Sequence, residues 1–157
     1  MIPNEIRERL QNIVDGTRLE GSADRCTTLR NLLVESFGTG STVKSEFESR
    51  AIIKEEQANF LKAWAESTGS LFDDLPERSA YLTKGGESKV YLAADGLNVI
   101  KVNDAIYYAT WDEYLNSLLF HNLLFPNTAH LLIGFIEIDN GLSAVLQQPF
   151  IEGVRQD

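Results

Sequence analysis

The stretch YLTKGGESKVYLAADGLNVIKV, residues 81–102, decides the fold of the chain. Its apolar and β-branched residues favour extended structure, and its two interruptions, Gly85-Gly86 and Asp95-Gly96, are typical turn residues. The pattern predicts three consecutive strands joined by two turns. The predicted strands are residues 80–84, 89–93 and 98–103.

A single lysine, Lys101, lies within the apolar run of the third predicted strand. Lysine is almost never fully buried without a partner, so we expect an acidic side chain beside it. A glycine turn that approaches a ligand closely, followed by a cation held on a sheet, is one way of binding the phosphates of a nucleotide. The alternative is that Gly85-Gly86 forms only a tight turn.

The helix predicted over residues 110–124 offers two acidic side chains to Lys101, those of Asp112 and Glu113. Thr110 and Glu113 also match a capping box, in which the glutamate bonds back to the N–H group of the threonine. Two interpretations of Glu113 therefore stay open. It is either the third residue of this cap or the partner of Lys101.

Two more strands follow this helix, joined by a turn at Asn140-Gly141. They are predicted at residues 131–138 and 142–148. The predicted fold class is α+β, with an N-terminal helical region followed by a five-stranded antiparallel sheet and one helix. The predicted domain organisation is a helical region at 1–67, a polar linker at 68–78 and the β-β-β-α-β-β unit at 79–157.

Composition limits the classes of function. The 157 residues carry a formal net charge of −9 with no segregated basic patch, so we expect no nucleic-acid partner. Apolar runs are too short to span a membrane, and the start lacks the layout of a signal peptide, which favours the cytoplasm. The single cysteine, Cys26, is predicted to be a buried thiol. We expect His121 and His130 to be packing residues.

The segment from Tyr81 to Gly153 resembles the small N-terminal lobe of protein kinases, the lobe that binds nucleotide. KGGESKVYLA, residues 84–93, is similar to the glycine-rich loop between the first two strands of that lobe. NVIKV, residues 98–102, is similar to its third strand, with Lys101 at the place of the lysine that contacts the phosphates.

The resemblance continues to the end of the chain. TWDEYLNSLLFHNLLFPN, residues 110–127, resembles helix C of kinases, and its only glutamate, Glu113, stands where the partner of the lysine is expected. FPNTAHLLIGFIEIDNG, residues 125–141, is similar to the region after helix C, and LSAVLQQPFIEG, residues 142–153, to the fifth strand and the start of the hinge. The resemblance is strongest to kinase-like domains of bacterial polyvalent proteins from mobile elements, many from Bacteroidetes, where it includes the N-terminal helices.

This resemblance implies a binding site for ATP. Lys101 would hold the phosphates, Glu113 would orient Lys101, Val90 would lie over the adenine, and Leu146 would be the gatekeeper. The loop over the phosphates would consist of Lys84, Gly85, Gly86, Glu87, Ser88 and Lys89. The edge of the base would meet the backbone of Gln147, Gln148 and Pro149.

Two departures from the kinase pattern limit what the resemblance implies. The glycines of the G-x-G-x-x-G loop correspond here to Thr83, Gly85 and Ser88, so one of the three remains. The catalytic loop and the metal-binding aspartate of kinases follow the hinge, and neither occurs up to Asp157. We therefore expect a nucleotide-binding lobe that is catalytically incomplete by itself, with Mg²⁺ needed only alongside a second lobe.

The alternative is a degenerate lobe that has lost nucleotide binding and acts as a protein-interaction module. Without a second lobe, an apolar patch would be exposed at Phe120, Leu124, Phe125 and the strand end near Phe150. The sequence therefore predicts self-association or a protein partner on this face, or else its cover by the N-terminal helices.

Overall fold

The computed structural model describes residues 3–19, 24–37, 47–74, 80–85, 88–93 and 95–149. They fold into an α+β arrangement, as predicted. The helices are α1 (Asn4–Asp15), α2 (Arg25–Phe37), α3 (Phe47–Thr68) and α4 (Trp111–Leu124), with a short 3₁₀ helix, η1 (Pro126–Thr128), after α4. The strands are β1 (Leu71–Phe72), β2 (Ala80–Gly85), β3 (Ser88–Leu92), β4 (Asn98–Asn103), β5 (Leu131–Ile138) and β6 (Gly141–Pro149).

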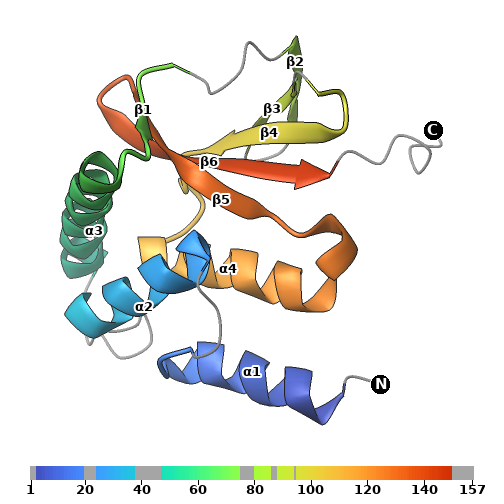
Figure 1. Cartoon of the computed structure of the whole chain (residues 1–157). Helices are drawn as coiled ribbons and strands as arrows, with labels where there is room; N and C mark the ends of the chain where they lie inside the picture. The colour runs from blue at the N-terminus through green and yellow to red at the C-terminus, as the bar shows by residue number, and fades with distance from the viewer. Residues whose placement is uncertain are drawn as a thin grey trace.

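The six strands form one sheet in the order β1-β5-β6-β4-β3-β2 (Figure 1). The five predicted strands pair antiparallel, as expected. The sheet as a whole is mixed, because β1 pairs in parallel with β5 at one edge. The prediction of a purely antiparallel sheet is therefore wrong. A strand of two residues is too short to show alternation, so the sequence pattern places Leu71 and Phe72 in the polar linker.

A close approach at Gly134 allows β1 to join the sheet. A Cβ atom at Gly134 would lie 2.3 Å from the backbone oxygen of Ser70 and 2.6 Å from the ring of Phe72. The N–H group of Phe135 donates to that same Ser70 oxygen over 2.9 Å. The Gly-Phe pair in β5 thus serves the strand pairing, since only glycine leaves room for it.

The turn between β5 and β6 has two residues with positive φ, Asp139 at 52° and Asn140 at 66°. Ile138 and Gly141 pair across it, so the turn lies one residue earlier than the predicted Asn140-Gly141. Positive φ at both central positions is typical of the two-residue hairpin turn that matches the twist of antiparallel strands. Asparagine and aspartate tolerate that conformation better than other non-glycine residues.

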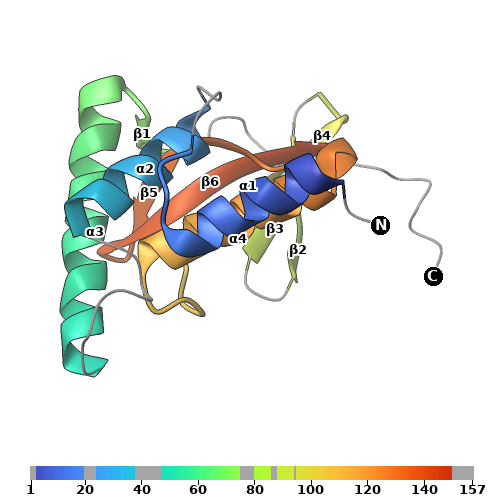
Figure 2. The ribbon, with the colours of Figure 1, turned by 90° about the horizontal axis from the view of Figure 1, so that it is seen from below.

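Helices α1, α2 and α4 lie on one face of the sheet, and α3 stands beside the β1 edge (Figure 1). Seen from below, α1 runs along the outer side of α4 (Figure 2). The core joins buried side chains from all four helices to β5 and β6. They include Ile13, Leu29, Leu61, Leu115 and Phe135. The N-terminal helices therefore share one core with the sheet and with α4.

Arg30 of α2 ties α1 to this core. Its side chain is fully buried and donates to the backbone oxygens of Asn12, Ile13 and Thr17 at the end of α1. Its Nε also donates to Asn116 of α4 over 3.0 Å. The oxygens of Asn12 and Ile13 also accept from the backbone N–H groups of Gly16 and Thr17, so the guanidinium group adds a second donor at this helix end.

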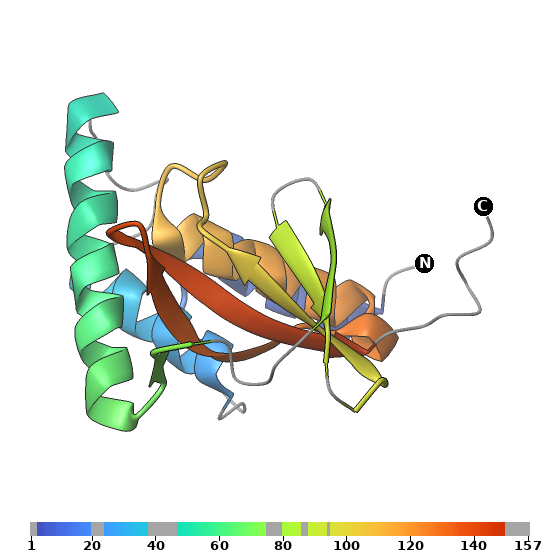
Figure 3. The ribbon, with the colours of Figure 1, turned by 90° about the horizontal axis from the view of Figure 1, so that it is seen from above.

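No described helix lies over the opposite face of the sheet (Figure 3). A smaller buried cluster there consists of Ala93, Ile100, Val102, Ile136 and Val145. Among the residues that the structure describes, no helix has the length and apolar character needed to cross a membrane.

Candidate functional site

Lys101 occupies the middle of β4, a central strand of the sheet. It pairs with Val90 of β3 on one side and with Leu146 of β6 on the other. Neighbouring residues of a strand point to opposite faces, and Ile100 and Val102 belong to the cluster on the outer face. The side chain of Lys101 therefore points toward α4.

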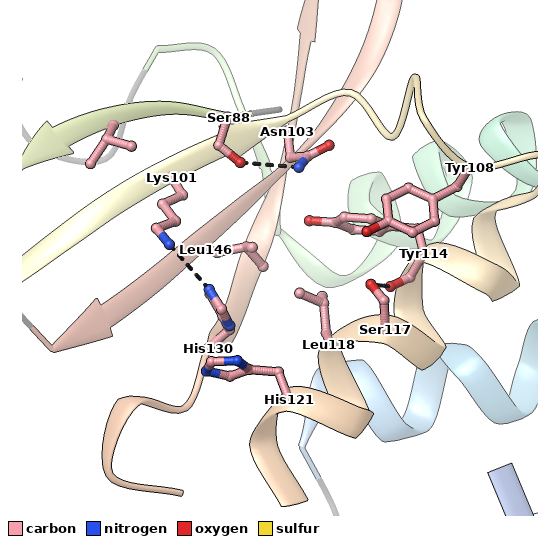
Figure 4. Close-up of a pocket in the computed structure, with 11 residues that line it drawn as sticks. Ser88, Lys101, Asn103, Tyr108, Tyr114, Ser117, Leu118, His121, His130 and Leu146 are labelled. Atoms are coloured by element: carbon pink, nitrogen blue, oxygen red, sulfur yellow. Dashed lines mark hydrogen bonds between the residues drawn. The ribbon is translucent and has the colours of Figure 1, made fainter. Parts of the chain in front are cut away.

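A cavity of about 370 Å³ lies between Lys101 and α4 (Figure 4). Its volume falls within the range of small-molecule sites. The sheet side is formed by Ser88, Val90, Lys101, Asn103 and Leu146. Helix α4 contributes Tyr114, Ser117, Leu118 and His121, while Tyr108 and His130 lie just before α4 and β5. Lysine, hydroxyl, amide and imidazole groups thus converge on one space.

The nearest polar neighbour of Lys101 in this cavity is an imidazole. Nζ of Lys101 lies 3.4 Å from Nε2 of His130 (Figure 4). Burial lowers the pKa of Lys101. Burial first, and then the charges of Lys101 and His121, lower the pKa of His130 to about 4. At neutral pH His130 is therefore uncharged and able to accept a hydrogen bond from the amine.

Hydrogen bonds hold both histidines in place. The backbone N–H of His130 donates to Oδ1 of Asn122 over 2.7 Å, and Nδ2 of Asn122 donates to the His130 oxygen over 2.9 Å. Nε2 of His121 bonds to the backbone oxygen of Thr128 over 2.9 Å. The two rings pack edge to face with centroids 4.6 Å apart. Both side chains were expected only to pack, but they form one end of the polar cavity.

The structure does not bring Glu113 to Lys101. Glu113 is half-buried, is absent from the cavity lining, and lies close enough to Lys54 of α3 to act on its pKa. The residues of α4 that line the cavity are Tyr114, Ser117, Leu118 and His121, and Glu113 precedes the first of them. Within the described ranges, no carboxylate lines the cavity, and no group of three metal-binding side chains is found.

The expected capping box does not form either. Thr110 is the N-cap residue of α4, but its side chain makes no capping bond and its Oγ1 is buried without a partner. Instead Gln57 of α3 accepts from the Trp111 N–H over 2.7 Å and donates to Oδ1 of Asp112 over 2.9 Å. A side chain from another helix therefore caps α4, which no local sequence pattern can reveal.

The hairpin between β2 and β3 borders the cavity at Ser88. Gly85 pairs with Ser88. Gly86, Glu87 and the side chain of Lys84 lie outside the described residues. Lys89 is exposed and does not line the cavity. Of the predicted loop over the phosphates, the structure places Ser88 at the cavity.

The residues predicted to meet the base lie in or beside the end of β6. Leu146 lines the cavity. Gln147, Gln148 and Pro149 still pair with β4, and Nε2 of Gln148 donates to the Thr128 oxygen over 2.8 Å. None of these three lines the cavity. Leu146 is thus next to Lys101 across β4 and β6, and the other three residues follow it at the end of β6.

Several cavity residues were not predicted from the sequence: Asn103, Tyr108, Tyr114, Ser117, His121 and His130. A weak signal was present, because Tyr114, Ser117, Leu118 and His121 recur at helical spacing and would share one face of α4. The signal for Asn103 was its place two residues after Lys101, on the same face of β4.

The strands around Lys101, with one helix packed behind the cavity, follow the β-β-β-α-β-β order of the lobe that the sequence resembles, and a comparison with protein families agrees. Residues 54–157 match the family Kinase-PolyVal, described as serine/threonine/tyrosine kinase found in polyvalent proteins, and the chain belongs to this family. No curated protein and no solved structure matched the chain.

Proposed function

We propose that the chain binds a nucleoside triphosphate, with its phosphates in the cavity beside Lys101. The observation that carries this proposal is a lysine on a central strand that points into a polar cavity in which no described carboxylate neutralises it. An amine in that setting gains most from an anionic ligand, because burial disfavours its charge until an opposite charge arrives.

The remaining lining fits an elongated ligand with a charged and an apolar end. The hydroxyl group of Ser88 borders the polar part, and because its Oγ accepts from Asn103 it can still donate to a phosphate oxygen. The hydroxyl group of Ser117 donates to the Tyr114 oxygen over 2.6 Å. Val90 and Leu146 flank Lys101 on the neighbouring strands and offer an apolar surface to a base. Mg²⁺ would accompany the nucleotide where further carboxylates are supplied, since Mg²⁺ prefers oxygen ligands.

The proposal is tested by titrating ATP and a non-hydrolysable analogue, with and without Mg²⁺, and following binding by calorimetry. Lys101→Met is expected to weaken binding by at least about tenfold, because it removes a charge-assisted hydrogen bond to phosphate. Lys62→Met is the control: Lys62 pairs with Glu137 over 3.1 Å on the surface. Absence of wild-type binding up to millimolar nucleotide would contradict the proposal.

The second candidate is a protein-interaction module, and exposed apolar side chains at one end of the molecule favour it. Leu124, Phe125 and Leu131 are 43%, 57% and 48% exposed where α4 ends and β5 begins. Phe120, which the sequence placed in this patch, packs half-buried against the core shared with α1 and α2.

Self-association through this end is tested by sedimentation over a range of concentrations, comparing the wild type with Phe125→Asp. We expect the charged variant to shift the chain toward monomer, because an interface disfavours an unpaired charge in its apolar centre. A wild type that stays monomeric at all concentrations, and binds no partner through Phe125, would leave nucleotide binding as the better supported function.

A further inference from the structure

Helix α3 contacts the segment between β4 and α4 through one lysine. Nζ of Lys54 donates to the backbone oxygens of Ala105 and Tyr108, each over 2.7 Å. Ala105 is fully buried and has a φ of 59°, a conformation that a non-glycine residue keeps only when its surroundings enforce it. The amine of Lys54 is therefore one of the contacts that hold this segment in shape.

The same segment is connected to the hairpin at the cavity through Asn103. Its Oδ1 accepts from the N–H of Ala105 over 2.7 Å, and its Nδ2 donates to Oγ of Ser88 over 3.0 Å. Asn103 is almost completely buried. The side chain of Asn103 thus joins Ala105, whose carbonyl group accepts from Lys54, to the serine that begins β3.

Helix α3 fixes the opposite wall of the cavity as well. Gln57, one turn after Lys54, caps α4 through Trp111 and Asp112, as described above. Gln57 is fully buried, so its amide has no water with which to exchange these bonds. Helix α4 in turn supplies Tyr114 and the other helical side chains of the cavity lining.

From these contacts we infer that Lys54 and Asn103 are positioning residues for the cavity beside Lys101, and that α3 is a part of the site and not only a neighbouring helix. The matched family region begins at residue 54 and so includes both side chains through which α3 reaches the walls. The inference rests on the proposed function for its effect on nucleotide, but the geometry it describes exists without ligand.

Two measurements test it, one without nucleotide and one with it. In ¹⁵N-labelled protein, Lys54→Met should move the signals of the Asn103 side-chain amide and the Ser88 backbone, which lie beyond the residues that Lys54 touches. It should also weaken nucleotide binding by about tenfold, because the hairpin would lose its fixed distance from Lys101. Lys54→Arg should restore both, since a guanidinium group donates to two carbonyl oxygens.

Lys62→Met is the matched control on the same helix, and we expect it to change neither measurement. Asn103→Ala interrupts the connection at its other end and keeps all contacts of α3, so it covers the case in which Lys54→Met does not fold. If both residues act through one connection, the double variant should bind nucleotide no more weakly than Asn103→Ala alone.

The outcomes separate the two claims. Shifted Asn103 and Ser88 signals in Lys54→Met, with no nucleotide binding by the wild type, would support the positioning and overturn the proposed function. Unchanged signals and unchanged affinity in Lys54→Met, with a wild type that binds nucleotide, would overturn the positioning and keep the function. If the losses of nucleotide affinity in the double variant were additive, Lys54 and Asn103 would not act through one connection, and the inference would be overturned.

Discussion

The amine of Lys101 and the imidazole of His130 form a pair, 3.4 Å apart, at the end of the cavity. An uncharged imidazole accepts a hydrogen bond without neutralising the amine, whereas a carboxylate would do both. The pair therefore leaves the charge of Lys101 for a ligand. The protonation of His130 in turn depends on the site, because burial and the nearby charge of Lys101 both lower its pKa.

The first prediction concerns the acid sensitivity that His130 confers. Its pKa of about 4 in the folded chain lies below its usual 6.5, so the unfolded chain binds more protons at this position between these values. Stability linked to His130 is present above pH 6.5 and is lost as the pH falls through about 4. Between pH 7 and pH 5 the free energy of unfolding should fall by about 1 kcal/mol less in His130→Asn than in the wild type, after discounting for the partial exposure of His130.

Urea unfolding at the two pH values measures this difference. The titration of the His130 ring protons by NMR reports the pKa directly. A midpoint near 6.5, or equal losses of stability in wild type and variant, would contradict the assignment of His130 to a desolvated site beside Lys101.

A second prediction concerns the room that Gly134 leaves for β1. Gly134→Ala should lower the free energy of unfolding by about 2–3 kcal/mol, because the new methyl group would overlap the Ser70 carbonyl oxygen and the Phe72 ring. Gly141→Ala is the control, since a Cβ there would meet its nearest neighbour at an ordinary 3.5 Å. Equal unfolding midpoints for the two variants would show that β1 does not constrain Gly134.

A third prediction concerns the buried guanidinium group of Arg30. Arg30→Met should lower the free energy of unfolding by about 2–4 kcal/mol, because the buried guanidinium group joins the end of α1 to Asn116 of α4 through several hydrogen bonds. Arg18→Met removes an exposed arginine that pairs with Glu35, and should cost less than about 1 kcal/mol. Chemical denaturation of both variants measures the contrast. A similar cost for the two would mean that α1 is held mainly by its apolar side.

A fourth prediction concerns the thiol of Cys26. Burial, with a smaller contribution from Asp24, raises the pKa of this thiol well above its usual range. Cys26 is buried and its Sγ lies 3.7 Å from the Leu115 oxygen. The native protein should therefore react with a thiol reagent far more slowly than the same protein in denaturant. Equal rates would place Cys26 at the surface.

Local sequence patterns were sufficient to predict most of the sheet. β4 and β5 occupy the predicted residues, and the other predicted strands differ by one residue at their ends. The reason is that alternation and turn residues act over a few neighbouring positions. β1 was missed because its pairing depends on Gly134, more than sixty residues away in sequence.

The site was predicted less completely, for the same reason. Lys101 was found because a lone lysine in an apolar strand is unusual in any sequence. Its neighbour His130 follows a connection whose path is set by the hydrogen bonds of Asn122. The phase of α4 decides that Tyr114 faces the cavity and Glu113 does not, and that phase is set in part by Gln57 of another helix. Such choices depend on packing between distant elements.

The core shared by α1, α2 and α4 extends beyond the segment that matches the family. The family match begins at residue 54, whereas Ile13, Leu29 and Leu33 are buried in the same cluster as Leu115. A protein cut at residue 54 would keep every residue that lines the cavity. It would nevertheless open the inner side of α4 to water, and aggregation would then hide any binding that the cavity retains.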